Sequence, residues 1–191
     1  DSFVLAGVLS DAVDSPLRAQ GRAAFFLRLI SRQRRLLSNL MKLGFSLPTA
    51  GEWATPENQI TIARQAEALR YNSVWVFHRL LYALEPKNEY PPVPGKVWPK
   101  AFESVFDPIV TLAYVAAATK HIRLGTSVLI MPFYAPAVLA KQLATLDVLS
   151  GGRAMAGLGI GWFEREHLLY GWDFPPRARR YELLEDALQL L

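Results

Sequence analysis

The sequence contains no cysteine among its 191 residues. The chain can therefore form no disulfide bond and offers no thiolate as a metal ligand or nucleophile. It also lacks an uninterrupted apolar run of the ~18 residues that a membrane-spanning helix needs. The apolar segment Phe3–Leu9 is too short for such a helix and lacks the basic lead of a signal peptide. We therefore expect a cytoplasmic protein with no metal site and no membrane partner.

A strong excess of positive charge is also missing from most of the chain. The sequence holds 21 basic and 17 acidic residues, a net charge of +4. The first forty residues contain six Arg and three Asp, so only +1 belongs to the remainder. A nearly neutral body gives no electrostatic footprint for a nucleic acid. We expect a small-molecule substrate and no nucleic-acid partner.

The stretch from Ile122 to Arg153 predicts a complete strand–helix–strand unit. Ile122–Ile130 is an apolar, β-branched run with little polar alternation, as in a parallel strand that is covered on both faces. Pro136 suits the first turn of a helix, and apolar residues follow it at helical spacing. The residues 150–152, Ser-Gly-Gly, end that helix because they tolerate a left-handed backbone. A second apolar run, Ala154–Ile160, follows.

The same alternation extends over most of the chain. Thr55-Pro56 and Asp107-Pro108 each combine a capping side chain with a proline in the first helical turn, which marks two further helix starts. Arg79–Ser104 is long and rich in proline, which indicates an irregular loop. The predicted strands are Lys42–Pro48, Val74–Phe77, Ile122–Ile130 and Ala154–Ile160, and the last helix is Arg180–Leu191. This order predicts an α/β fold with a parallel sheet, and periodicity alone leaves a doubly wound sheet and a barrel open.

Three segments in a fixed order carry a resemblance to a known family. They are GTSV at 125–128, AKQLATLDVLSGGR at 140–153 and GLGIGW at 157–162. Together they resemble the bacterial luciferase-like flavin and deazaflavin oxidoreductases, and within these the branch that uses the deazaflavin coenzyme F420. The resemblance runs from Met41 to Leu191. It implies a (β/α)8 TIM barrel, of which this chain supplies the first strand to the fourth helix.

Residues 1–40 do not share this resemblance. We interpret 1–40 as an N-terminal extension and 41–191 as the N-terminal half of a luciferase-like barrel. Residues 22–40 have the spacing of a basic amphipathic helix. Such a helix fits a partner or a membrane surface, and it equally fits an appended segment that is not native to the enzyme.

The resemblance implies hydride transfer between F420 and a small organic substrate. Two alternatives stay open. An FMN-dependent monooxygenase of the same superfamily would use reduced flavin and O2, whereas a truncated, inactive or binding-only remnant would catalyse neither reaction. Because members of the family are often dimers, a homodimer is a further expectation.

The resemblance places the cofactor, F420 or FMN, at the carboxyl ends of the strands, where barrels build their sites. It implies a bulge with a non-prolyl cis peptide at Ser127-Val128, against which the ring of the cofactor would rest. The glycines of the fourth strand suit close approach to a planar ring, and they equally suit tight packing inside a barrel without a ligand. The remaining cofactor contacts that it implies are Leu47, His78, Gly159, Ile160 and Gly161.

His78 and Arg79 end the second strand and are the candidate catalytic residues. Relatives commonly have Asp, then His or Arg, at these places, so His78 departs from the pattern. Histidine could replace the acid as a proton donor because its pKa lies near neutrality. A structural histidine and an impaired site are the alternatives.

Three residues beyond the fourth strand complete the candidates. Glu164 and Glu166 either act in the pocket or begin a helix as solvated or Arg-paired carboxylates. Trp162 stands where some deazaflavin sugar-phosphate dehydrogenases have a catalytic Glu, which argues against a sugar phosphate as the substrate.

A half barrel would leave two parallel sheet edges and an apolar helix face uncovered. We therefore expect the 191-residue chain alone to self-associate or to be poorly soluble. The usual phosphate-binding strands of such barrels would follow Leu191, so this chain alone should also bind cofactor weakly. Sedimentation velocity tests the first expectation, which a monodisperse monomer would contradict. A fluorescence titration with F420 tests the second, which micromolar affinity would contradict.

Overall fold

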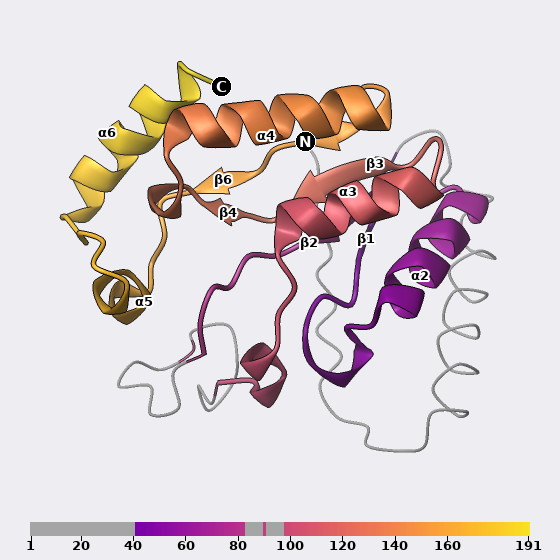
Figure 1. Ribbon diagram of the computed structural model, residues 1–191, viewed down its shortest axis with the longest axis horizontal. Coiled ribbons are helices and arrows are strands. Elements are labelled where there is room, and N and C mark those ends of the chain that lie inside the picture. Colours follow the sequence, from indigo (N-terminus) through magenta and orange to yellow (C-terminus); the bar gives the residue numbers. More distant parts are fainter. Residues whose placement is uncertain (1–40, 83–89, 91–97) are drawn as a thin grey trace.

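Strands and helices alternate along the chain (Figure 1). The computed structural model describes residues 41–82, 90 and 98–191. The predicted extension at 1–40 and part of the predicted 79–104 loop lie outside these residues. The elements are β1 (Gly44–Ser46), η1 (Gly51–Trp53), α2 (Pro56–Ala68), β2 (Ser73–Val76), η2 (Lys100–Glu103), α3 (Pro108–Ala118), β3 (Arg123–Thr126), β4 (Leu129–Ile130), η3 (Met131–Phe133), α4 (Pro136–Ser150), β5 (Ala154–Met155), β6 (Leu158–Gly159), α5 (Glu164–Leu169) and α6 (Arg177–Leu188).

The helix boundaries follow the capping signals of the sequence. The Thr55 side chain accepts a hydrogen bond from the Asn58 amide at 3.2 Å, and Pro56 begins α2. Asp107 does the same for α3, where its carboxylate accepts from the Val110 amide at 2.8 Å. Gly151 ends α4 with a φ of 71°, in the left-handed region that glycine adopts without steric cost. These three predictions are confirmed.

The sheet distinguishes between the two architectures that periodicity left open. Its strands run in the order β1-β2-β3-β5, all neighbours are parallel, and α2, α3 and α4 lie on one face (Figure 1). A doubly wound sheet would reverse its strand order and carry helices on both faces. The consecutive order is that of a partial (β/α)8 barrel, as the family resemblance implied.

Two predicted strands are each divided in the structure. The run 122–130 forms β3 and β4, with a non-prolyl cis peptide at Ser127-Val128 between them. The run 154–160 forms β5 and β6, and β6 pairs in parallel with β4. The ladder therefore continues past the bulge as a second, two-stranded segment, and the bulge predicted from the family resemblance is confirmed.

The main core lies between this sheet and its helices. Strand residues that alternate along β1 to β3 face α2 and α3, where fully buried alanines allow close approach of helix and sheet. A smaller core joins β4 and η3 to α4 and α6. The main core includes Leu47, Val74, Val76, Leu124, Ala63, Ala66, Leu112 and Val115.

One indole occupies the opposite face of the sheet. Trp75 lies between Gly44 and Gly125 on the neighbouring strands, and its Nε1 donates to the Ser73 hydroxyl at 2.8 Å. A methyl group added to either glycine would collide with the indole. Both glycines are therefore needed to let one large ring span three strands.

A buried arginine joins the ends of two helices to two strands. Arg153 is 8% exposed and lies just before β5. Its guanidinium donates to the carbonyls of Ala116, Thr119 and Ile122 and to the Thr119 hydroxyl, at 2.9–3.2 Å. Its Nε donates to the Ser150 carbonyl at 2.6 Å. Because the carbonyls of Ala116, Thr119 and Ser150 lie at the ends of α3 and α4, the arginine satisfies acceptors that the helices themselves leave open.

The C-terminal part departs most from the sequence-based expectation. A short helix, α5, begins at Glu164 between the fourth strand and the last helix, as one of the two alternatives for Glu164 and Glu166 requires. The last helix begins at Arg177 rather than Arg180, and of its apolar side chains Ala187 is buried whereas Tyr181 and Leu188 are exposed. Among the described residues, no helix combines the length and apolarity that a membrane crossing requires.

Replacing Arg153 by lysine should lower the free energy of unfolding by about 2–3 kcal/mol, because a single ammonium cannot reach the five acceptors and leaves some of them buried and unpaired. Urea unfolding measures this change. Arg123→Lys is the matched control, since Arg123 is exposed and its replacement should cost less than about 0.5 kcal/mol. Equal losses in the two variants would contradict the role assigned to Arg153.

Candidate functional site

The carboxyl end of β3 presents two exposed residues between two buried ones. Thr126 is 1% exposed and Leu129 is fully buried, whereas Val128 between them is 45% exposed. The Ser127 amide donates to the Val76 carbonyl at 2.7 Å, and the Leu129 amide donates to the Gly157 carbonyl at 2.8 Å. The bulge is therefore fixed at both ends while Ser127 and Val128 face outward.

Glycines allow the neighbouring segment to lie directly against this bulge. The Thr126 hydroxyl accepts from the Gly157 amide at 2.9 Å and donates to the Gly157 carbonyl at 3.0 Å. A Cβ at Gly157 would collide with the Thr126 carbonyl, and one at Gly159 would lie 2.7 Å from Val128 Cγ2. The structure thus brings three of the residues that the resemblance implied as cofactor contacts, Ser127, Val128 and Gly159, close together.

Gly161 has a different neighbourhood. Its φ is +72°, and a Cβ there would lie 2.7 Å from the ring of His167. Its carbonyl accepts a hydrogen bond from the Arg180 guanidinium, which also lies 4.0 Å from the centroid of the Phe174 ring. Gly161 therefore serves tight packing within the chain, and Ile160 beside it is half-buried.

Leu47 lies on the helix-facing side of its strand. Its side chain is 2% exposed within the main core. Its amide donates to the Trp75 carbonyl at 2.8 Å, and its carbonyl accepts from the Thr49 amide at 2.9 Å. Because side chains alternate along a strand, Ser46 is the residue of this strand end that is exposed. At this strand end the side chain of Ser46 therefore reaches solvent, whereas that of Leu47 packs in the core.

His78 is buried beneath η3. Its Nδ1 accepts a hydrogen bond from the Ile130 amide at 3.1 Å, and its ring lies against Phe133 and Tyr134. Burial lowers the pKa of His78 to about 4, aided by the positive charge of Arg79 and opposed by Asp107. The imidazole is therefore neutral near pH 7 and carries its proton on Nε2. A neutral imidazole is a poor proton donor, so the geometry favours an orienting role over general acid catalysis.

Arg79 points into a different environment from His78. Its guanidinium forms an ion pair with Glu166 of α5 at 2.7 Å, and both side chains are nearly fully buried. The other carboxylate oxygen of Glu166 accepts from the amides of Leu80 and Leu81, at 2.8 and 3.2 Å. One glutamate thus fixes the segment that follows β2.

The sequence left several roles open for Glu166: a residue of the pocket, a solvated carboxylate or a partner of an arginine. The Arg-paired alternative holds for Glu166, whereas Glu164 at the start of α5 is exposed. The partner could have been suspected from Arg79, since a charged residue directly after a buried strand needs a countercharge. Which carboxylate supplies it depends on where α5 lies, and local sequence does not encode that.

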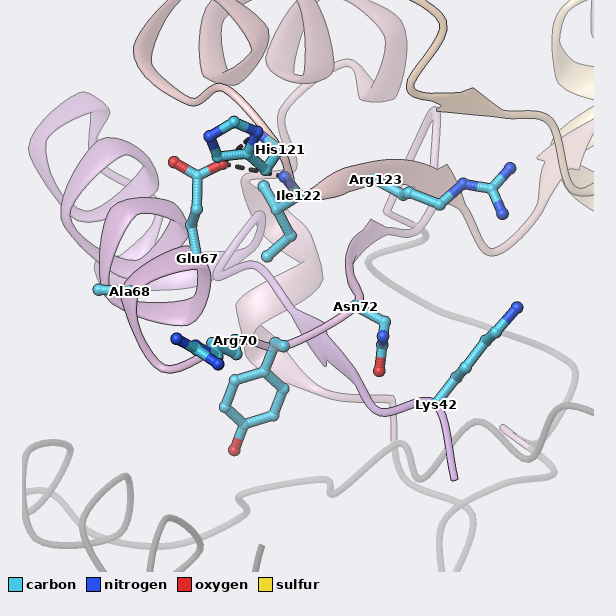
Figure 2. Close-up of a pocket in the computed structure, with 9 residues that line it drawn as sticks. Lys42, Glu67, Ala68, Arg70, Asn72, His121, Ile122 and Arg123 are labelled. Carbon is cyan, nitrogen blue, oxygen red and sulfur yellow. Dashed lines mark hydrogen bonds between the residues drawn. The ribbon is translucent and has the colours of Figure 1, made fainter. Parts of the chain in front are cut away.

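A separate hollow of about 600 Å³ lies at the opposite end of the strands (Figure 2). It is lined by the end of α2 and by the residues that lead into β1, β2 and β3. Lys42 and Arg123 extend to one side, whereas Glu67 and His121 lie on the other (Figure 2). Because these charges do not converge and barrels place their chemistry at the carboxyl ends of strands, this hollow is not the candidate site. The described residues also contain no cluster of side chains suited to a metal ion.

The chain is similar to proteins of one family over most of its length. The model of the family described as luciferase-like monooxygenase matches residues 40–191. An F420-dependent glucose-6-phosphate dehydrogenase from Kineococcus radiotolerans is 32% identical over 152 residues, which cover 79% of this chain and 40% of the relative. One from Amycolatopsis mediterranei is 29% identical over 153 residues, covering 80% and 41%. This chain therefore spans about 40% of the length of these relatives.

The fold comparison agrees with the sequence comparison. The crystal structure of monooxygenase RslO1 from Streptomyces bottropensis superposes with a TM-score of 0.60 at 23% identity. The match covers 77% of this chain and 41% of that one. At this level of identity, the similarity concerns the fold alone.

The low pKa of His78 predicts a loss of stability in acid. The unfolded chain would protonate this imidazole near pH 6.5, whereas the folded chain would do so only near pH 4. The native state therefore binds fewer protons in this window, and the free energy of unfolding should fall by up to about 3 kcal/mol as the pH drops from 7 to 4.

Urea unfolding at both pH values, compared with His78→Gln, isolates this contribution. Glutamine can still accept from the Ile130 amide but does not titrate. The comparison is necessary because burial also lowers the pKa of His167, which both proteins retain. An equal loss of stability in the two proteins would contradict the assignment to His78.

Proposed function

Because this chain belongs to the luciferase-like monooxygenase family, we propose that the protein is an oxidoreductase that moves a hydride between F420 and a small organic molecule. The curated relatives at 29% and 32% identity are named for F420 dependence, which supports F420 over FMN. The monooxygenase structure that the chain resembles is only 23% identical and carries no argument about the cofactor.

The proposal rests on one observation within the chain. Val128 is an exposed apolar side chain at the carboxyl edge of the sheet, where buried segments flank it on both sides. Its Cγ2 methyl group lies over Gly159, and its Cγ1 methyl group faces Gly157. An apolar shelf in this position fits the face of a planar ring, and the exposed Ser127 adds a polar group beside it. Ser127, Val128 and Gly159 are therefore the residues proposed to hold the cofactor.

The protein's own contribution is binding, orientation and exclusion of water. F420, when bound, supplies the ring that accepts or donates the hydride. The neutral His78 holds η3 through its bond to the Ile130 amide and keeps a proton at Nε2 for a hydrogen bond. Arg79 is engaged by Glu166, so we propose that it positions the loop after β2 and does not react itself.

The experiment compares the variants Val128→Asp and Val148→Asp of the full-length protein. Both valines are exposed, at 45% and 79%, but Val148 lies near the end of α4, away from the carboxyl edge of the sheet. An added carboxylate at 128 would be forced against an apolar ring face. We expect Val128→Asp to weaken F420 binding at least about tenfold and Val148→Asp to leave it unchanged, since desolvating a charge is costly.

Fluorescence titration with F420 measures the affinity, and a parallel titration with FMN tests the alternative. Bleaching of the F420 absorbance by candidate alcohols or reduced substrates tests hydride transfer itself. Binding of FMN without binding of F420 would contradict the cofactor assignment and favour the monooxygenase. Binding of neither would favour the non-catalytic remnant.

A further inference from the structure

The Arg79 guanidinium lies among aromatic rings at the carboxyl end of the sheet. Its central carbon is 5.2 Å from the ring centroid of Trp98 and 5.5 Å from that of Trp162. Phe102 and Phe163 lie at 5.8 and 5.9 Å. Cation–π attraction at these distances holds the rings around the cation. We call Arg79, Trp98, Phe102, Trp162 and Phe163 the aromatic box.

Trp162 is the member of the box that reaches solvent. It is 43% exposed, whereas Trp98 is 4% exposed and Phe163 is 1% exposed. Its indole stacks on Trp98, with the centroids 5.9 Å apart and the planes at 29°. It follows the end of β6 by three residues. The box thus supports one large aromatic side chain, three residues along the chain from the proposed cofactor residue Gly159.

The box offers no free positive charge to a ligand. The Glu166 carboxylate neutralises the Arg79 cation at 2.7 Å, and the side chains of both residues are at most 6% exposed. A phosphorylated substrate needs a cation that can form direct hydrogen bonds to its oxygens. Glu166 also binds the amides of Leu80 and Leu81, so releasing Arg79 would loosen the backbone as well.

We propose that Trp162 forms one wall of the substrate site and that the Glu166–Arg79 pair positions this wall for an uncharged, planar molecule. This inference rests on the proposed function for the location of the site. It departs from the curated relatives, because their names specify a sugar phosphate as substrate. Glu166 is a positioning residue in this proposal: it acts on Trp162 through Arg79.

Two probes that differ only by a phosphate group test the substrate class. Equilibrium dialysis at pH 7, without cofactor, compares 2-naphthol with 2-naphthyl phosphate. The protein should bind 2-naphthol at least about tenfold more tightly. Trp162→Ala should weaken naphthol binding about three- to tenfold, the range expected for one lost stacking partner. Tyr114→Ala is the matched control, since Tyr114 is 48% exposed on the outer helix α3, and it should change nothing.

Glu166→Gln tests the positioning role. It keeps a hydrogen-bonding side chain but removes the countercharge of Arg79, so the preference should shift toward 2-naphthyl phosphate. A merely structural role would weaken both probes equally, and that result would overturn the role of Glu166. If this variant does not fold, Trp162→Ala still decides whether the wall exists.

The results separate this inference from the proposed function. Tighter binding of 2-naphthyl phosphate, or unchanged naphthol binding in Trp162→Ala, would overturn the inference even where F420 binds normally. Naphthol selectivity that depends on Trp162, in a protein that fails to bind F420, would support the wall and contradict only the cofactor assignment.

Discussion

One buried guanidinium holds together the strand–helix–strand unit around which the fold is built. Arg153 has no carboxylate partner among the described side chains. It donates its side-chain hydrogen bonds to carbonyls and to one hydroxyl, and most of these acceptors lie at the ends of α3 and α4. The C-terminal ends of helices carry partial negative charge, so a cation placed there offsets the cost of its own burial. Because β5 begins directly after Arg153, the same bonds set where β5 lies beside β3. This register also sets where Gly157 and Gly159 meet the bulge.

At each end of the sheet, one glutamate side chain accepts hydrogen bonds from successive backbone amides. At the amino end, Glu67 of α2 accepts from the three successive amides of residues 120–122, and these backbone bonds lower its pKa although burial opposes them. At the carboxyl end, Glu166 accepts from two successive amides after β2 and adds Arg79. Each carboxylate satisfies backbone donors that a turn would otherwise leave unpaired. The bonds of Glu67 fix α2 against the segment that enters β3. The bonds of Glu166 hold Arg79, and the Arg79 guanidinium lies against the exposed ring of Trp162.

Local signals in the sequence were sufficient for the element order and for several boundaries. Thr55, Asp107 and Gly151 each act within a few residues of themselves, so their effect can be read without knowing the fold. The barrel followed only from the family resemblance, since strand order is a long-range property. The burial of the Leu47 side chain could not be predicted, because the family resemblance implied a contact at this strand end without indicating which face of the sheet each side chain occupies. The burial of Glu166 depends on its ion pair with Arg79, which lies 87 residues away in the chain.

The packing of the Trp75 indole against Gly44 and Gly125 couples substitutions at these three positions. No side chain can be gained at either glycine while the ring stays, and a smaller residue in place of the ring would open a void across three strands. A single substitution at any of these three positions should therefore destabilise the fold, whereas a compensating substitution at a second position could restore the packing. Homologues of this protein should keep Trp75, Gly44 and Gly125 together or replace them jointly, so this layer of the sheet should evolve more slowly than the exposed faces of the helices.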